Sequence, residues 1–314
     1  MSGHVYHSLT ALVGNTPLVE LRHLDVPDGV RVYAKLEGQN PSGSVKDRVV
    51  VGLLAAAARE GRLRPGMPLV EATTGNTGIA LALLGRRLGH PVHVFVPRNV
   101  FPAIPRLLRS FGAQITWVDP SEGMHGAIAW ARAWAAERDG LMLDQFGNEA
   151  NPRAHYETTA AEILRDLGRV DVFVAGLGTG GTIMGVGRRL KEASPGAKVV
   201  AVEPHPGSQV QGLRSLEEGF VPPILDLGLL DGKILVRSAS AFRAARELTR
   251  REGLFGGVSS GAVLHGTLRW CRRMRRGTVV ALFADAGWKY LETGLWTTEA
   301  PDGDEEALDD LFWW

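Results

Sequence analysis

Short runs rich in β-branched residues alternate with longer segments of helical periodicity from Val30 to Phe283, and no other feature limits the choice of fold as strongly. The pattern is typical of βαβ units, in which helices connect the strands of a mostly parallel sheet. We therefore expect an α/β fold. The predicted strands are residues 32–36, 68–72, 92–96, 114–118, 172–175, 199–203 and 278–283, and residues 46–60 and 77–88 are predicted helices.

The predicted strands divide between two lobes, because they are too many for one small domain and 314 residues suffice for two cores. We expect a smaller, mobile lobe at residues 46–143. The larger lobe combines residues 1–45 with residues 144–314, and each lobe is a mostly parallel sheet flanked by helices. The larger lobe ends in a C-terminal tail, residues 302–314, where an acidic run precedes Leu311, Phe312, Trp313 and Trp314.

Composition excludes several classes of function. Lys and Arg total 35 against 34 Asp and Glu, so the net charge gives no reason to expect a nucleic-acid or membrane partner. The single cysteine, Cys271, rules out an intrachain disulfide and a thiolate zinc site, and no spacing of His, Asp or Glu suggests a metal site. With neither a signal-like N-terminus nor an apolar run of ~20 residues, we expect a cytoplasmic protein.

The glycine-rich segment from Gly176 to Thr182 follows a predicted strand and opens a segment of helical character. Glycines let the backbone approach an anion, and a helix N-terminus offers free N–H donors, so we expect this loop to bind a phosphate. Its glycines also satisfy the dinucleotide fingerprint, and Glu203 ends the next strand where a ribose-binding carboxylate belongs. On these residues alone, a nicotinamide cofactor and another phosphate ligand are equally good interpretations.

Lys46 stands at the predicted start of a helix, after a strand and a turn rich in small residues. A helix N-terminus and desolvation both lower the pKa of a lysine, and only the neutral amine attacks a carbonyl. The position therefore suits a lysine that forms a Schiff base. On spacing alone, a solvated lysine in a first helical turn is the simpler interpretation.

Two further loops, residues 71–78 and 256–261, also precede predicted helices. The first is rich in hydroxyl groups and carries Asn76, so it offers donors for a carboxylate and for a phenolate-type oxygen. The second carries Ser259, whose hydroxyl could contact a ring nitrogen. Helix capping explains either loop without a ligand.

Together these segments resemble the cysteine synthase family, which are fold type II enzymes that use pyridoxal 5'-phosphate. The resemblance runs from about Leu12 to about Thr293, nearly the whole chain, and makes the dinucleotide interpretation a minor one. The matching motifs, in order, are residues 14–18, 41–48, 71–78, 145–151, 155–156, 178–182 and 258–262.

The resemblance implies a role for each motif. Lys46 carries the cofactor as a Schiff base and later removes the substrate Cα proton, Asn76 contacts the phenolic oxygen of the ring, and Ser259 lies at the pyridine nitrogen. A neutral partner at that nitrogen favours loss of a β-substituent, so the implied reaction is β-replacement on an activated serine through an aminoacrylate intermediate. The cofactor phosphate is held by Gly178, Thr179, Gly180, Gly181 and Thr182, and the substrate carboxylate by Thr73, Thr74 and Thr77, with Gln145 nearby.

The chain departs from the commoner members of the family at three places. Thr74 replaces a serine, and residues 101–105 replace a polar run. Arg214 stands where the O-acetylserine enzymes lack an arginine. A phosphate dianion gains from the paired donors of a guanidinium, whereas a neutral acetyl ester does not, so Arg214 predicts O-phosphoserine as the substrate. A surface ion pair with Glu217 or Glu218 is the alternative.

Arg214 and residues 285–290 resemble the branch of the family that takes O-phosphoserine and a thiocarboxylated small sulfur-carrier protein. Members of that branch end in an apolar tail that can enter the active site, so we expect the tail of this chain to form a lid, with packing or a dimer contact as alternatives. The family also implies a homodimer.

The arginines of residues 269–276 are interpreted as a solvated helix face, with docking of an acidic carrier as the minority interpretation.

Other functions remain open within the same fold. They include an O-acetylserine sulfhydrylase that uses sulfide, a cystathionine β-synthase and a serine or threonine dehydratase, although none of these needs Arg214. A non-catalytic regulatory homologue is an alternative of a different class, although it need not retain Lys46.

Overall fold

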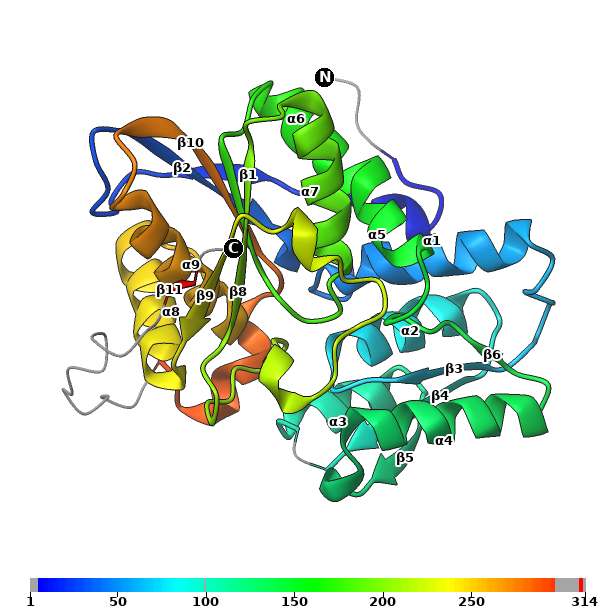
Figure 1. Ribbon diagram of the computed structural model, residues 1–314. Helices are drawn as coiled ribbons and strands as arrows, with labels where there is room; N and C mark the ends of the chain where they lie inside the picture. Colours follow the sequence, from blue (N-terminus) through cyan, green and yellow to red (C-terminus); the bar gives the residue numbers. More distant parts are fainter. Residues whose placement is uncertain (1–4, 99, 297–310, 313–314) are drawn as a thin grey trace.

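Residues 5–98, 100–296 and 311–312 are described by a computed structural model, and within them the strands form two separate sheets (Figure 1). The smaller sheet has the order β5-β4-β3-β6, and its strands are parallel. Its members are β3 (Leu69–Ala72), β4 (Val92–Pro97), β5 (Gln114–Val118) and β6 (Leu141–Met142).

Helices cover both faces of this smaller sheet. α4 (Gly123–Glu137) packs on one face through small side chains, among them Ala127 and Ala131. The other face is covered by apolar residues of three helices, which are α1 (Lys46–Arg59), α2 (Asn76–Arg87) and α3 (Ala103–Ser110). Because α1 and α2 each bury one apolar side against this sheet, their first residues are held at fixed positions.

The larger sheet has the order β1-β2-β10-β7-β8-β9-β11, with parallel pairing in its centre and antiparallel pairing at its two edges. Its centre is buried on both faces, which explains why its strands read as nearly continuous apolar runs. The strands are β1 (Leu18–Leu21), β2 (Gly29–Leu36), β7 (Val172–Gly176), β8 (Lys198–Pro204), β9 (Gly232–Val236), β10 (Arg276–Phe283) and β11 (Leu311–Phe312).

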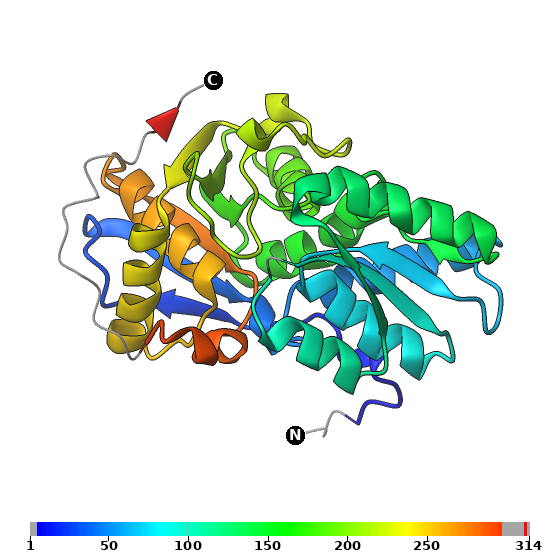
Figure 2. The same cartoon turned by 90° about the horizontal axis from the view of Figure 1, so that it is seen from below.

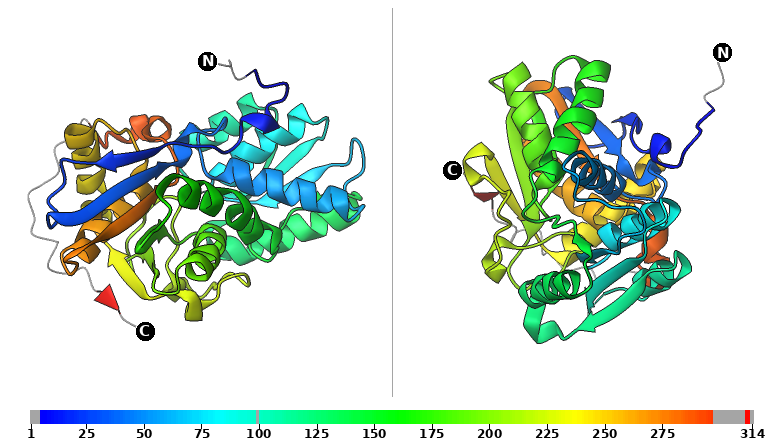
Figure 3. Two further views of the ribbon diagram at one scale, coloured as in Figure 1. Left: turned by 90° about the horizontal axis from the view of Figure 1, so that it is seen from above. Right: turned by 90° about the vertical axis from the view of Figure 1, so that its right-hand side faces the viewer.

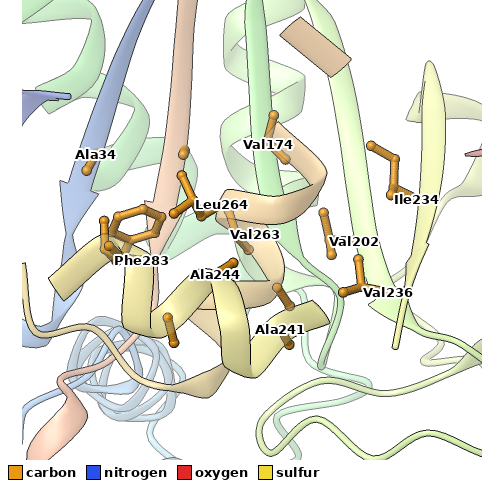
Figure 4. Close-up of a cluster of buried hydrophobic side chains, with 14 of the residues drawn as sticks. Ala34, Val174, Val202, Ile234, Val236, Ala241, Ala244, Val263, Leu264 and Phe283 are labelled. Carbon is orange, nitrogen blue, oxygen red and sulfur yellow. The ribbon is translucent and has the colours of Figure 1, made fainter. Parts of the chain in front are cut away.

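Successive residues of β7 point to opposite faces of the larger sheet, so Val174 and Phe173 belong to different cores. Figure 4 shows Val174, Val202 and Ile234 directed toward α8 (Ser238–Glu252) and α9 (Val258–Cys271). The helices against the opposite core are α6 (Ala160–Leu167) and α7 (Gly181–Ala193). α5 (Ala150–Ala154) packs against α1 and α7, and a π-helix (His155–Thr159) connects it to α6.

Short 3-10 helices fill several connections. They are η1 (Thr10–Leu12), η2 (Glu37–Gln39), η3 (Pro120–Glu122), η5 (Leu216–Glu218), η6 (Leu227–Leu229) and η7 (Gly287–Thr293). Figures 2 and 3 show the two sheets lying side by side, with the N-terminal strands β1 and β2 built into the larger one. None of the described helices is long and apolar enough to cross a bilayer.

The predicted α/β class, with mostly parallel sheets flanked by helices, is confirmed. The predicted strands are present with small shifts at their ends; for example, β2 begins at residue 29 instead of residue 32. The sequence analysis missed β1, β6, β9 and β11. β9 escaped notice because Lys233 leaves it a short apolar run, Ile234–Val236, and a buried ion pair from Lys233 to Glu203 (2.7 Å) allows that charge inside the sheet.

The lobe boundaries at residues 46 and 143 stay predictions. The predicted lid falls mainly on residues 302–310 and 313–314, which lie outside the described residues. Leu311–Phe312 pair with Ile234 and Lys233 of β9.

Residues 101–105 form the start of α3, with Pro102 as N-cap and Pro105 in the first turn, where a proline is tolerated because its missing N–H has no helical partner.

Candidate active site

A pocket is lined by loops that follow the carboxyl ends of β3, β7 and β10, so both sheets contribute to it. Ligands of open parallel sheets bind at this end of the strands. The pocket brings together nearly all the residues that the sequence analysis selected. Those that line it are Lys46, Thr73, Thr74, Asn76, Thr77, Gln145, Gly178, Thr179, Gly180, Thr182, Arg214 and Ser259, and Gly181 lies between two of them in sequence.

Lys46 is the first residue of α1. The turn before it is held against the helix, because the Ser42 backbone N–H donates to the Asp47 carboxylate (2.7 Å). Burial lowers the pKa of the Lys46 amine to about 8; nearby Asp285 opposes this shift and nearby Lys289 adds to it. An amine that loses its proton close to neutral pH can attack a carbonyl without a separate base.

The glycine loop approaches its neighbours more closely than any side chain would permit. A Cβ at position 181 would lie 1.9 Å from Asn151 Oδ1, and one at position 178 would lie 2.9 Å from the carbonyl of Gly212. Gly180, the N-cap of α7, has a φ of +87°, which favours glycine. The loop therefore presents bare backbone and a helix N-terminus to the pocket.

Hydroxyl groups of this loop are held by neighbouring helices. Thr179 accepts a hydrogen bond from the Asn151 side chain (3.1 Å), and Thr182 lies 3.2 Å from Nε2 of His155. His155 is fully buried, and burial lowers its pKa well below the usual value, so it is neutral. One cavity thus combines an amine of lowered pKa with an anion-binding helix N-terminus, which fits a phosphorylated aldehyde.

The loop after β3 is held by a hydrogen bond within itself and by bonds to Gln145 and Gln211. Thr73 accepts from the Gly75 backbone N–H (3.0 Å), and the Thr77 hydroxyl donates to Gln145 Oε1 (2.5 Å). The carbonyl of Thr74 accepts from the Gln211 side chain (3.1 Å). These bonds hold several donors at one wall of the pocket, where a substrate carboxylate would compete for them.

Asn76 belongs to a polar cluster that the sequence analysis did not assign to the site. Its Nδ2 donates to Asp285 Oδ2 (2.8 Å), and its Oδ1 accepts from Lys289 Nζ (2.6 Å). The Tyr290 hydroxyl also donates to Asp285 Oδ2 (2.6 Å). Residues 285–290 matched the family, but a match does not reveal that these side chains turn inward toward α2.

Arg214 is half-buried and lines the same pocket. Its backbone N–H donates to the carbonyl of Leu177 (2.8 Å), and its guanidinium lies over the rings of Phe146 (5.6 Å) and Phe220 (5.1 Å). Two aromatic contacts limit the conformations of a long side chain and keep its charge at the pocket.

Ser259 is the second residue of α9 and is 4% exposed. Its position at a helix N-terminus places both a hydroxyl and the positive end of a helix dipole at the pocket. Ile104 of α3 lies at the same pocket, so the departure of residues 101–105 from the family adds an apolar side chain there.

A wider cavity of about 490 Å³ adjoins the pocket and shares Thr74, Gln211 and Arg214 with it. Residues 120–125 line one side of this cavity and residues 204 and 208–210 line the other. Arg214 therefore lies where the two spaces meet.

A buried ion network anchors the helix that carries Lys46. Arg48 donates to Glu37 on η2 (2.7 Å) and to Glu162 on α6 (2.7 Å), and Lys35 on β2 also donates to Glu162 (2.6 Å). Burial disfavours the charge of Glu162, but the two cations outweigh burial and lower its pKa to about 2. Spacing in the sequence gave no indication of this network, because its members come from four elements.

The family described as pyridoxal-phosphate dependent enzyme matches residues 9–285. Among curated proteins, the cysteine synthase of Aquifex aeolicus is 41% identical over 301 residues, which is 92% of each chain. Cysteine synthase B of Salmonella typhimurium is 40% identical over 294 residues, covering 93% of this chain and 97% of the relative. The crystal structure of an O-ureido-L-serine synthase superposes with a TM-score of 0.89 at 34% identity, over 97% of this chain and 99% of that one.

Proposed function

Because this chain belongs to the cysteine synthase family of pyridoxal-phosphate dependent enzymes, we propose that it makes cysteine by replacing the phosphate of O-phosphoserine with sulfur. The observation that carries this choice of substrate is the position of Arg214. Its side chain lies at the pocket that also holds Lys46 and the threonine-rich loop after β3.

When bound, pyridoxal phosphate stabilises the electron pair left on the substrate Cα after the proton is removed. Lys46 would hold the cofactor covalently through its carbonyl carbon, and the helix N-terminus at Gly181 would hold its phosphate. Asn76 would donate to the phenolic oxygen, and the Ser259 hydroxyl would contact the ring nitrogen.

The Lys46 amine would also accept the Cα proton of the substrate. Its lowered pKa leaves a useful fraction of the amine neutral near pH 7, and a base poised near the working pH is the most effective. At Ser259, neither a hydroxyl nor the positive end of α9 favours a proton on the ring nitrogen. This arrangement supports loss of the β-substituent over transamination.

Arg214 would bind the leaving phosphate. Phosphate carries close to two negative charges and pairs with the forked donors of a guanidinium, whereas an acetyl ester offers a neutral oxygen. Phe146 and Phe220 hold the guanidinium at the pocket before substrate arrives, so little conformational freedom is lost on binding.

The test compares kcat/KM for O-phosphoserine and O-acetylserine in the wild type and in Arg214→Ala. We expect the wild type to prefer O-phosphoserine and the variant to lose ~100-fold on that substrate, equivalent to about 2.7 kcal/mol, with little change on O-acetylserine. Arg153→Ala is the control, because Arg153 is exposed on α5 and pairs with Glu157 away from the pocket. A wild type that prefers the acetyl ester would make this chain an O-acetylserine sulfhydrylase.

The sulfur donor reaches the pocket through the wider cavity. A cavity of about 490 Å³ exceeds what sulfide needs, which supports a thiocarboxylate delivered by a small sulfur-carrier protein. Initial rates with sulfide and with a thiocarboxylated carrier, measured at equal donor concentration, decide between the two. Equal or higher rates with sulfide would remove the reason to invoke a carrier.

We also propose that the enzyme acts as a homodimer, which sedimentation velocity checks.

A further inference from the structure

Lys289 is a buried cation that has no direct contact with the reacting groups in the proposed chemistry. Its side chain is 2% exposed, and its amine donates to the carbonyl of Gly43 (3.1 Å) and to Asn76 Oδ1 (2.6 Å). Burial lowers the pKa of Lys289, while Asp285 and Asp47 oppose that shift. Placing a lysine in such an environment costs stability, so its presence calls for a function in the site.

The two charged neighbours of Asn76 determine which way its amide group lies. A lysine amine has only donors, so the atom next to Lys289 must be the amide oxygen. An ionised carboxylate has only acceptors, so the atom next to Asp285 must be the amide nitrogen. The orientation therefore follows from the chemistry of both neighbours, which lie 2.6 Å and 2.8 Å from the amide atoms.

We propose that Lys289 is a positioning residue that locks the Asn76 amide with its NH₂ group available to the phenolic oxygen of the cofactor. The inference rests on the proposed role of Asn76. The amide nitrogen carries two hydrogens; Asp285 takes one, and the Tyr290 hydroxyl competes for the other with a ligand in the pocket that Asn76 and Tyr290 both line. A reversed amide would present its oxygen to an anionic oxygen and repel it.

Lys289 also joins three segments that are distant in sequence. Gly43 lies in the turn before Lys46, Asn76 begins α2, and Lys289 itself lies in η7. A single amine therefore fixes the first turn of the helix that carries Asn76 relative to the turn that precedes Lys46. Losing this contact would release both residues that are proposed to touch the cofactor.

The test is a double-mutant cycle on the holoenzyme with Asn76→Ala, Lys289→Met and the double variant. The two measurements are the dissociation constant for pyridoxal phosphate, by equilibrium dialysis, and the pH dependence of the visible absorption of the bound cofactor. We expect each single variant to weaken cofactor binding by about tenfold and to shift the absorption. The double variant should lose clearly less affinity than the two single losses combined, because part of the effect of Lys289 acts through that amide. Lys289→Arg, which keeps a charged donor, should recover most of the affinity.

The outcomes separate this inference from the proposal on which it rests. If Asn76→Ala leaves affinity and absorption unchanged, the proposed role of Asn76 is wrong. If Asn76→Ala changes both but Lys289→Met changes neither, or if the two effects simply add, Lys289 does not position the amide. Should Lys289→Met fail to fold, Lys289→Gln, which keeps a neutral donor, takes its place in the cycle with the same expected non-additivity.

Lys233→Met is the matched control for loss of a buried lysine. Lys233 is 8% exposed and pairs with Glu203 inside the larger sheet, outside the pocket. We expect it to lower the unfolding temperature without shifting the absorption of the bound cofactor. A matching shift in this control would mean that general destabilisation, and not the Asn76 amide, produces the spectral change.

Discussion

A lysine in water has a pKa near 10.4 and is almost fully protonated at neutral pH. In the pocket, burial of Lys46 lowers its pKa to about 8, Asp285 partly restores it and Lys289 lowers it further. Below that value the amine is charged and unreactive, and above it the amine is neutral and nucleophilic. The reactivity of this residue should therefore follow the pH through a midpoint well below that of an ordinary lysine.

This expectation can be measured in the apoprotein, without catalysis. The rate at which the apoprotein recombines with pyridoxal phosphate should rise with pH around a midpoint of about 8. Asp285→Asn removes an opposing negative charge and should move the midpoint down, whereas Lys289→Met removes a positive charge and should move it up. A midpoint near 10.4 in the wild type would show that Lys46 is not desolvated in the pocket.

Sequence analysis found some site residues and missed others for a physical reason. Lys46 and Ser259 could be selected because each lies in a helix-start motif that matches the family, whereas the local pattern alone favoured a solvated lysine and a helix cap. Asp285 and Lys289 were missed as site residues because each meets Asn76 only through the fold, across 209 and 213 positions of the chain respectively. No local pattern shows that a lysine near the C-terminus lies inside the site.

Among the elements, the junction between β7 and α7 leaves the least room for an added side chain. Gly180 adopts a left-handed conformation, and Gly181 packs where α5 brings Asn151 within contact. The glycine pattern predicted a phosphate loop but left the ligand open between two cofactors. The family matches resolved that choice, because a tight strand-to-helix turn serves either cofactor equally well.

Gly181→Ala tests this junction. The new Cβ would lie 1.9 Å from Asn151 Oδ1, so the helix or its neighbour must move. We expect the free energy of unfolding to fall by about 1–3 kcal/mol and pyridoxal phosphate to bind at least tenfold more weakly, by urea titration and equilibrium dialysis. Gly196→Ala is the control, because nothing lies within 4 Å of a Cβ there. Wild-type cofactor affinity in Gly181→Ala would contradict the close packing of the loop.

Across the whole molecule, the buried ion network connects the helix of the reactive lysine to the larger sheet. Glu162 on α6 accepts from Arg48 on α1 and from Lys35 on β2. Alternating strands and helices predicted two sheets correctly, but they could not predict which charges would be buried between elements. Burial of an ion pair is decided by the packing of distant segments and not by the local period of apolar residues.

Replacing Glu162 by glutamine should destabilise the molecule by about 3–5 kcal/mol, because two buried cations lose a neutralising partner. Urea unfolding at neutral pH measures this loss. Glu149→Gln is the matched control, because Glu149 pairs with Arg188 at the surface and is 64% exposed, so its loss should cost at most about 1 kcal/mol. Equal losses in the two variants would mean that the buried network contributes no more than a surface pair.

Glu162 also makes the free energy of unfolding depend on pH, and the direction of that dependence follows from its pKa shift. The pKa of Glu162 is lowered from 4.5 to about 2 in the folded state, so the unfolded chain binds a proton at higher pH than the folded chain does. The stabilisation is fully present above about 4.5 and is lost as the pH falls toward 2. The wild type should lose stability over this range more steeply than Glu162→Gln does, which urea midpoints at several pH values would show.

The central claim is that Lys46 is the residue that bonds covalently to pyridoxal phosphate. Reduction of the holoenzyme with borohydride, followed by digestion and mass spectrometry, identifies the modified lysine directly. The account predicts a pyridoxyl group on the peptide that contains Lys46 and none on the peptide that contains Lys289, although both amines lie close to the pocket. A pyridoxyl group on Lys289, or on neither residue, would contradict it.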